Sequence, residues 1–211
     1  MYDVVIKNGL IVDGSGGAGY RADLAIQGDK IASIGRINAP ARQTIDAEGH
    51  VVSPGFVDGH THMDAQVFWD PIGSCSCYHG VTSVVMGNCG FTLAPCKQED
   101  ADLVFRNLER AEDLSREAML AGIDWTWETF PQFLDSVDRL PKGINYAGYI
   151  GHSALRTYTM GERAFTEQAS EDDLKHMQAL VKEAMQAGAI GFSTSRTFNH
   201  ITADERPVAS R

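Results

Sequence analysis

The chain has 211 residues, of which 43% are hydrophobic and 22% charged, and its formal net charge at pH 7 is −10. This composition fits a soluble globular protein of one or two domains. The acidic balance argues against a nucleic-acid or anionic-membrane partner, because both need a basic surface. The amino terminus resembles no signal peptide, and no apolar run approaches the roughly 20 residues that span a bilayer. We therefore expect a cytoplasmic protein.

Residues 1–53 predict a small β module, interpreted as a partial sandwich. Short runs with strand character occur at 4–6, 10–12, 24–26, 31–34 and 51–52. Asn8-Gly9, between the first two runs, predicts a type I′ hairpin, and residues 27–30 predict a second turn. Residues 14–19 match the dinucleotide-binding pattern G-x-G-x-x-G, but a strand-like segment follows them instead of a helix. We interpret these glycines as a flexible loop without a nucleotide.

From residue 54 onward, strands alternate with helices. Strands are predicted at 81–86, 144–152 and 189–194, and the first of these is β-branched without alternation, as in a parallel strand covered on both faces. Helices are predicted at about 99–121, at 125–137 with an interruption near Pro131, and from a Ser170 cap with Asp173 three residues on to a stop at Gly188.

This rhythm predicts an α/β fold with a parallel sheet. Polar residues concentrated after strand ends favour a (β/α)8 TIM barrel, whose sites are built there. Only about four of eight strands can be counted, and a whole barrel takes roughly 250 residues. We therefore expect residues 54–211 to form the first part of a truncated barrel, belonging to a longer enzyme.

Two histidines follow the short apolar segment that begins this second part. On a strand, residues at i and i+2 point to the same face, so His60 and His62 could direct both imidazoles to one point. Neutral imidazole is a common metal ligand, although a pair of surface loop histidines is the alternative. Without a secretory signal, ligand or thiol roles are favoured over disulfides for the four cysteines, Cys75, Cys77, Cys89 and Cys96.

These motifs resemble a known family. Residues 51–62, V-V-S-P-G-F-V-D-G-H-T-H, resemble the entrance motif of the amidohydrolase superfamily, which joins a β-sandwich to the first barrel strand. Residues 80–90, G-V-T-S-V-V-M-G-N-C-G, with 151–156 and 191–194, resemble the N-acyl-D-amino-acid deacylases, or D-aminoacylases. The resemblance covers essentially the whole chain. It implies a hydrolase of a linear amide, a carbon–nitrogen bond other than a peptide bond, with one or two zinc ions and a small acylated amino acid as substrate.

The resemblance also implies a set of metal ligands. His60 and His62 would bind metal. Many relatives bridge two metals with a carboxylated lysine after the fourth strand, but residues 191–200 contain no lysine. Cys89 can take that place, because zinc deprotonates a coordinating thiol; a buried core thiol is the alternative. Two further histidines and the catalytic aspartate are expected beyond Arg211, so no catalytic residue is assigned in this chain.

Three residues are weaker candidates for contacts with the ligands or the substrate. Asp64 could orient a ligand imidazole or cap a loop. His152 lies in a segment that resembles the family. Arg196 could clamp a substrate carboxylate or pair with a surface acid, and it stands near Phe198, where family members often have a tyrosine for that carboxylate. For His200 the alternatives are a site histidine and a loop residue, of which we favour the loop residue.

Two alternatives stay open. A cyclic-amide hydrolase of the same superfamily, such as a dihydropyrimidinase or hydantoinase, would favour the lysine bridge, so Cys89 argues against it. A non-catalytic metal-binding half-barrel would leave two strand edges open, which is unfavourable. The sequence assigns neither the exact substrate, the number of metals nor the oligomeric state.

Overall fold

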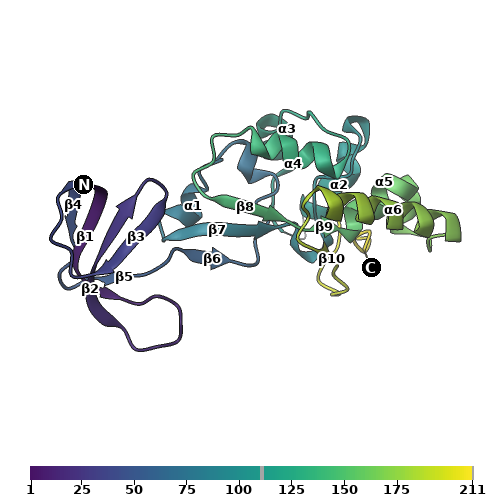
Figure 1. Ribbon diagram of the computed structural model, residues 1–211. Helices are drawn as coiled ribbons and strands as arrows, with labels where there is room; N and C mark the ends of the chain where they lie inside the picture. Colours follow the sequence, from purple (N-terminus) through teal and green to yellow (C-terminus); the bar gives the residue numbers. More distant parts are fainter. Residues whose placement is uncertain (110–111, 211) are drawn as a thin grey trace. The chain divides into compact units, whose positions relative to one another are not determined.

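The computed structural model describes residues 1–109 and 112–210 and shows an α/β chain. The chain divides into two compact units, Met1–Gly55 and Phe56–Arg211. The first unit is one five-stranded sheet of order β3-β2-β1-β4, with β5 paired to β1 (Figure 1). Its strands are β1 (Tyr2–Ile11), β2 (Tyr20–Gln27), β3 (Lys30–Gly35), β4 (Ala41–Asp46) and β5 (Val51–Val52). Val5, Ala25 and Ile37 form its small buried core.

The hairpin predicted at Asn8-Gly9 is wrong. Strand β1 runs through both residues, and its register against β2 shifts between Ile6 and Gly9. Asn8 adopts the left-handed φ of 63° that favours a turn, but its backbone N–H donates to Oδ1 of Asp23 at 3.1 Å. The extra residue is therefore absorbed as a β-bulge within one long strand.

Two other predictions for this unit are confirmed. β2 and β3 pair antiparallel with Gln27 opposite Lys30, so residues 27–30 form the turn between them. Residues 14–19 connect β1 to β2 as a loop, with no helix after them. A loop between two antiparallel strands presents no helix N-terminus to a phosphate, so the strand–helix context that gives the nucleotide pattern its meaning is missing at residues 14–19.

The second unit contains only parallel strand pairs among its described strands. β6 (Phe56–Asp58), β7 (Val81–Met86) and β8 (Asn145–Gly148) form a sheet of that order, and β9 (Ile150–Gly151) pairs with β10 (Phe192–Ser193) (Figure 1). The order along the sheet follows the order along the chain, with the helical segments between the strands. This is the arrangement that βα units produce.

The helices of this unit correct two sequence predictions. The single helix predicted at 99–121 is two helices, α2 (Ala101–Glu109) and α3 (Arg116–Gly122), and residues 110–111 lie outside the described part. Ser115 caps α3 by accepting from the N–H of Ala118 at 3.3 Å. Apolar spacing alone does not reveal this break, because the pattern resumes on the far side of it.

Pro131 does not interrupt a helix but helps to begin one. α4 (Phe130–Asp138) starts at a capping box formed by Thr129 and Gln132, with the proline in its first turn. A proline is tolerated there because the first N–H groups of a helix have no intrahelical acceptor. The capping box predicted at Ser170 and Asp173 is confirmed at the start of α6 (Glu171–Ala187).

The remaining elements are short, apart from one helix that the sequence did not predict. That helix is α5 (His152–Met160), and it begins directly after β9. The others are α1 (Ser74–Cys77) and the 3-10 turns η1 (Gln66–Phe68), η2 (Asn88–Gly90), η3 (Gln98–Asp100) and η4 (Gly161–Phe165). No described helix combines the length and the apolar character needed to cross a membrane.

An aromatic core holds the helices of the second unit together. Trp125 and Trp127 stack with ring centroids 4.6 Å apart, and Phe133 meets Trp127 edge-on at 5.3 Å. Both tryptophans are therefore packing residues. The largest fully buried side chains of this unit include Phe91, Phe105, Phe130, Phe133, Met86, Leu93, Leu108, Met119, Ile150 and Leu155.

Two neighbouring residues of α3 test this core. The side chain of Met119 is fully buried, whereas Leu120 is 59% exposed. We expect Met119→Ala to lower the free energy of unfolding by about 2–5 kcal/mol through lost burial and a cavity. Leu120→Ala, the matched control, should change it by less than about 1 kcal/mol. Urea denaturation followed by tryptophan fluorescence measures both, and equal effects would contradict this packing.

Candidate metal centre

Two loops meet where strands β6 and β7 end. The strands are parallel neighbours, with Asp58 opposite Val84, so both carboxyl ends lie at the same edge of the sheet. His60 and His62 follow β6, and Cys89 follows β7. Between the two histidines, the N–H and the hydroxyl of Thr61 both donate to the carbonyl of Val85, at 3.0 and 2.8 Å. These two hydrogen bonds fix the histidine segment against the carboxyl end of the neighbouring strand β7.

The loop that carries Cys89 has an unusual backbone. Gly87, Cys89 and Gly90 have φ values of 79°, 56° and 85°, in the left-handed region that glycine tolerates and other residues rarely adopt. A Cβ at Gly87 would lie 2.6 Å from the carbonyl oxygen of Tyr149. The side-chain amide of Asn88 donates to the carbonyls of Thr61 at 3.2 Å and Val85 at 2.9 Å. The tight turn therefore holds the thiol toward the histidines.

The sequence-predicted ligands come together. Nε2 of His60 lies 3.4 Å from Sγ of Cys89, and the rings of His60 and His62 are 5.4 Å apart between centroids. One nitrogen from each histidine and the sulfur lie within 4.8 Å of one another. Imidazole nitrogen and thiolate sulfur are the donors that a borderline-soft divalent metal such as zinc takes.

Two further residues join this cluster. Oε2 of Glu112 lies 3.1 Å from Nε2 of His62, and Oε1 of Glu112 lies 3.8 Å from Nε2 of His200. Cys89, Glu112 and His200 form a second group whose ligand atoms lie within 4.8 Å of one another. The two groups share the thiol, so five side chains converge on one small volume.

Sequence reasoning missed Glu112 and favoured a loop residue over a site histidine for His200. Glu112 follows α2 in a stretch of charged residues, where nothing distinguishes it from a solvated helix face. His200 was interpreted as a loop residue, and the structure places it instead in the cluster, with a half-buried side chain and its ring 5.2 Å from that of Phe91. A local pattern cannot find either residue, because each is far along the chain from the histidine pair and Cys89 and meets them only in the folded structure.

The electrostatics of the cluster favour ligand forms of the histidines. Burial, together with His60 and His200, lowers the pKa of His62 to about 4, and burial lowers the pKa of His200. Both imidazoles are therefore neutral at pH 7, with a lone pair available. Burial and the nearby Glu112 carboxylate raise the pKa of Cys89, and burial raises that of Glu112. Without a metal, the thiol therefore keeps its proton.

Several buried polar atoms in the cluster have no hydrogen-bond partner. These are Nδ1 of His62, Oε1 of Glu112 and Nδ1 of His200. Unpaired buried polar atoms are costly, and native proteins keep few of them. An ion bound among these donors would remove that cost. The residues present therefore fit a metal ion.

Asp64 supports the cluster from behind. Its side chain is buried, and Oδ2 accepts the N–H of Gly87 at 2.9 Å, while Oδ1 has no partner. Burial raises the pKa of this carboxyl to about 7, against the lowering effect of the Gly87 N–H. The bond joins the chain two residues after His62 to the start of the Cys89 loop. Of the two sequence-level interpretations, it matches the capping of a loop.

The other candidates lie apart from the ligands. Nδ1 of His152 lies 2.9 Å from the hydroxyl of Thr194, and His152 lines a separate cavity with Arg196. Cys75 is exposed, Cys77 half-buried and Cys96 buried, and none of these three belongs to either metal-binding group.

The Glu112 carboxylate should control the reactivity of the metal-free thiol. We expect Glu112→Gln to lower the pKa of Cys89, because a negative charge that opposes the thiolate is removed. In chelator-treated protein, the rate of Cys89 alkylation by iodoacetamide should rise at a lower pH than in the wild type, as measured by peptide mass spectrometry. Glu99→Gln, remote from the cluster, is the control, and an unchanged profile in Glu112→Gln would refute the contact.

Comparison with known proteins shows which proteins this chain resembles. A D-aminoacylase from Alcaligenes xylosoxydans xylosoxydans is 38% identical over 194 residues, covering 92% of this chain and 37% of that protein. A D-aminoacylase crystal structure superposes with a TM-score of 0.77 at 34% identity, covering 92% of this chain and 38% of that one. The N-acyl-D-glutamate deacylase of Bordetella bronchiseptica, solved with zinc and a phosphonate inhibitor, gives 0.76 at 32% identity over the same shares.

These matches concern one part of larger proteins. The chain spans about a third of the length of the curated relatives it matches, between 32% and 38%. The model of the amidohydrolase family matches residues 43–209, which include both strand ends and all five converging side chains. The chain therefore belongs to the amidohydrolase family.

Proposed function

We propose that this chain is part of a zinc-dependent hydrolase of the D-aminoacylase type, which cleaves the linear amide of an N-acyl-D-amino acid. The observation that carries the proposal is the convergence of His60, His62 and Cys89 at adjacent strand ends. The relatives named as deacylases of D-amino acids support the substrate class. A small acylated amino acid is thus the proposed partner.

His60, His62 and Cys89 are the proposed zinc ligands, and Glu112 and His200 lie close enough to complete the site around one or two ions. Such an ion supplies Lewis-acid polarisation of a carbonyl and activates water as a nucleophile. Cys89 must lose its proton to serve as a ligand, and its raised pKa makes metal loading depend on pH.

The protein's own residues position this chemistry. Glu112 holds one nitrogen of His62 and leaves Nδ1 without a partner, which is how a carboxylate orients a ligand imidazole. The neutral forms of His62 and His200 avoid adding positive charge beside a bound cation. The general base, which would take a proton from water and pass it to the leaving amine, is proposed to be an aspartate outside residues 1–211.

We also propose the domain organisation that the sequence suggested. Residues 1–53 would form a partial β-sandwich module, of which the five-stranded sheet of the first unit would be one layer. Residues 54–211 would form the first part of a (β/α)8 barrel, supported by the parallel strands in chain order and by a cluster at their carboxyl ends. In that fold, sites are built at the carboxyl-terminal face.

The two alternatives make different demands. A hydantoinase-like enzyme would hydrolyse a cyclic amide, and the cysteine in the cluster, with no lysine in residues 191–200, favours the linear amide. A non-catalytic metal-binding protein would bind zinc through the same side chains without turnover. Assays of the whole enzyme to which this chain is proposed to belong, on N-acetyl-D-leucine, N-acetyl-L-leucine and a 5-substituted hydantoin, separate all three.

Removal of the proposed thiolate tests the metal site itself. Loss of a residue that only hydrogen-bonds a metal ligand weakens metal binding by about 10- to 100-fold. We expect Cys89→Ala, which removes a ligand itself, to weaken zinc binding by more than this. In the whole enzyme, deacylation of N-acetyl-D-leucine should fall with it. Zinc content by mass spectrometry and competition with a chromogenic chelator provide the measurement.

The matched control is Cys77→Ala, because this half-buried cysteine lies in neither metal-binding group. It should keep the zinc affinity of the wild type. Equal zinc affinity in the two variants would refute Cys89 as a ligand. Loss of zinc in Cys89→Ala, together with no turnover of the three substrates by the wild-type whole enzyme, would favour the non-catalytic alternative.

A further inference from the structure

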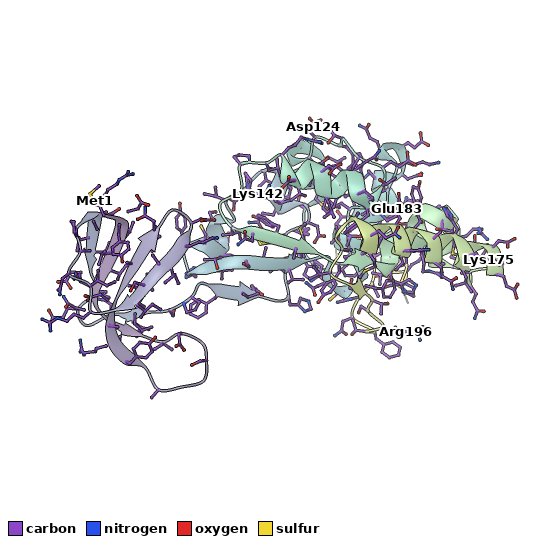
Figure 2. All side chains as sticks on the ribbon, in the orientation of Figure 1. Met1, Asp124, Lys142, Lys175, Glu183 and Arg196 are labelled. Carbon is purple, nitrogen blue, oxygen red and sulfur yellow. The ribbon has the colours of Figure 1, made fainter. Side chains whose placement is uncertain are left out.

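One side chain of β10 reaches the loop that carries Cys89. The hydroxyl of Ser193 donates to the carbonyl of Gly87, and it accepts the N–H of Gly90 at 3.0 Å. These two backbone groups lie on either side of Cys89, so a single hydroxyl bonds the turn before and after the thiol. Figure 2 shows Arg196 on the loop that directly follows β10, which places the strand end beside this region of the second unit.

The turn needs such a contact because its backbone is unfavourable for a cysteine. Cys89 has a φ of 56°, in the left-handed region where a Cβ is crowded by the backbone. Gly87 and Gly90 also have positive φ, but glycine adopts it without a steric cost. A residue other than glycine stays in this region only when the surrounding structure fixes it there. The contacts around Cys89 therefore decide whether the turn keeps its shape.

The other side-chain bonds to this turn act before Cys89. The amide of Asn88 donates to the carbonyls of Thr61 and Val85, and the carboxyl of Asp64 accepts the N–H of Gly87. All of these bonds connect the turn to β7 or to the loop that follows β6. After Cys89, Ser193 is the one described residue whose side chain bonds the backbone of Gly90. Ser193 therefore holds the side of the turn that the other contacts leave open.

A short hydroxyl suits this position. It has one O–H donor and two acceptor lone pairs, so it satisfies a carbonyl and an N–H at the same time. Ser193 itself is placed by the parallel pairing of β10 with β9, where it lies opposite Gly151. Its position is thus set by a sheet and not by the turn that it contacts, and the serine lies 103 residues after Gly90.

We propose that Ser193 is a positioning residue for the metal centre, because its hydroxyl holds Cys89 in the left-handed conformation that directs the thiol toward the histidines. The inference rests on the proposed function, which makes Cys89 a zinc ligand. Without the hydroxyl, the carbonyl of Gly87 and the N–H of Gly90 lose their shared partner, and the turn relaxes. Sγ of Cys89 then leaves its place 3.4 Å from Nε2 of His60, and zinc affinity falls.

Two substitutions of matched shape test the hydroxyl. Ser193→Thr and Ser193→Val introduce side chains of nearly equal volume that both suit a strand, and only threonine keeps the O–H. Ser193→Val should weaken zinc binding by about 10- to 100-fold, the range for loss of a group that supports a ligand without binding the metal. Ser193→Thr should keep most of the wild-type affinity. Competition with a chromogenic chelator measures zinc affinity, and urea denaturation shows that each variant is folded.

Ser83→Val is the control for loss of a hydroxyl in a parallel strand of the same unit. Ser83 is a half-buried residue of β7, and its hydroxyl accepts from the amide of Asn145 at 3.3 Å instead of contacting the Cys89 turn. This variant should bind zinc like the wild type. Equal zinc affinity in Ser193→Thr and Ser193→Val would overturn the proposal, because the hydroxyl would then have no effect.

A double-mutant cycle separates positioning of the thiol from a general loss of structure. If Ser193 acts through Cys89, Ser193→Val should cause little further loss of zinc affinity in a Cys89→Ala background, where His60 and His62 remain. The same fold-loss in both backgrounds would contradict an action through the thiol. In the cobalt-loaded protein, the thiolate-to-cobalt absorption should weaken in Ser193→Val and persist in Ser193→Thr.

Hydrolysis of N-acetyl-D-leucine by the whole enzyme is assayed separately. Zinc affinity that depends on the Ser193 hydroxyl, in a wild-type enzyme without turnover, contradicts the deacylase function alone. Turnover by an enzyme whose zinc affinity is unchanged in Ser193→Val contradicts the positioning role alone.

Discussion

The parallel pairing of β6 with β7 is the constraint on which the rest of the second unit depends. It places the carboxyl ends of two strands at one sheet edge, and the two histidines and the cysteine lie just beyond those ends. A slip of one residue would turn alternate side chains to the opposite face. Past the end of β6, the two hydrogen bonds from Thr61 to the carbonyl of Val85 hold the histidine segment against β7. Register is therefore the first determinant of the metal centre.

The buried polar side chains next to the cluster hold the Cys89 loop in position at a cost to the stability of the fold. Asp64 is buried with one oxygen unpaired, which is unfavourable on its own, yet its other oxygen holds the N–H that opens the Cys89 loop. Asn88 is buried as well and satisfies two carbonyls with one amide. An apolar residue at either position would remove a buried polar group and also release the loop. Local costs of this kind are common where a fold must hold a site in place.

The sequence predicted the meeting of the proposed ligands better than their surroundings. The strand pattern places His60 and His62 just past a strand end, and the family resemblance adds Cys89, which follows the neighbouring strand. Glu112 and His200 reach the cluster through helices and loops whose path no local pattern encodes. The bulge at Asn8 failed for a related reason, since a left-handed residue fits both a hairpin and a bulge, and only the partner strand decides between them.

The Cys89 loop and the start of α5 meet through backbone atoms. A Cβ at Gly151 would lie 2.5 Å from the carbonyl oxygen of Gly90, so two glycines let the loop after β7 approach the start of α5 without an intervening side chain. The N–H of Gly90 also donates to the hydroxyl of Ser193 in β10 at 3.0 Å. The residue after Cys89 is therefore held by β10 and by the start of α5. The position of the thiol thus depends on later strands as well as on the pairing of β6 with β7.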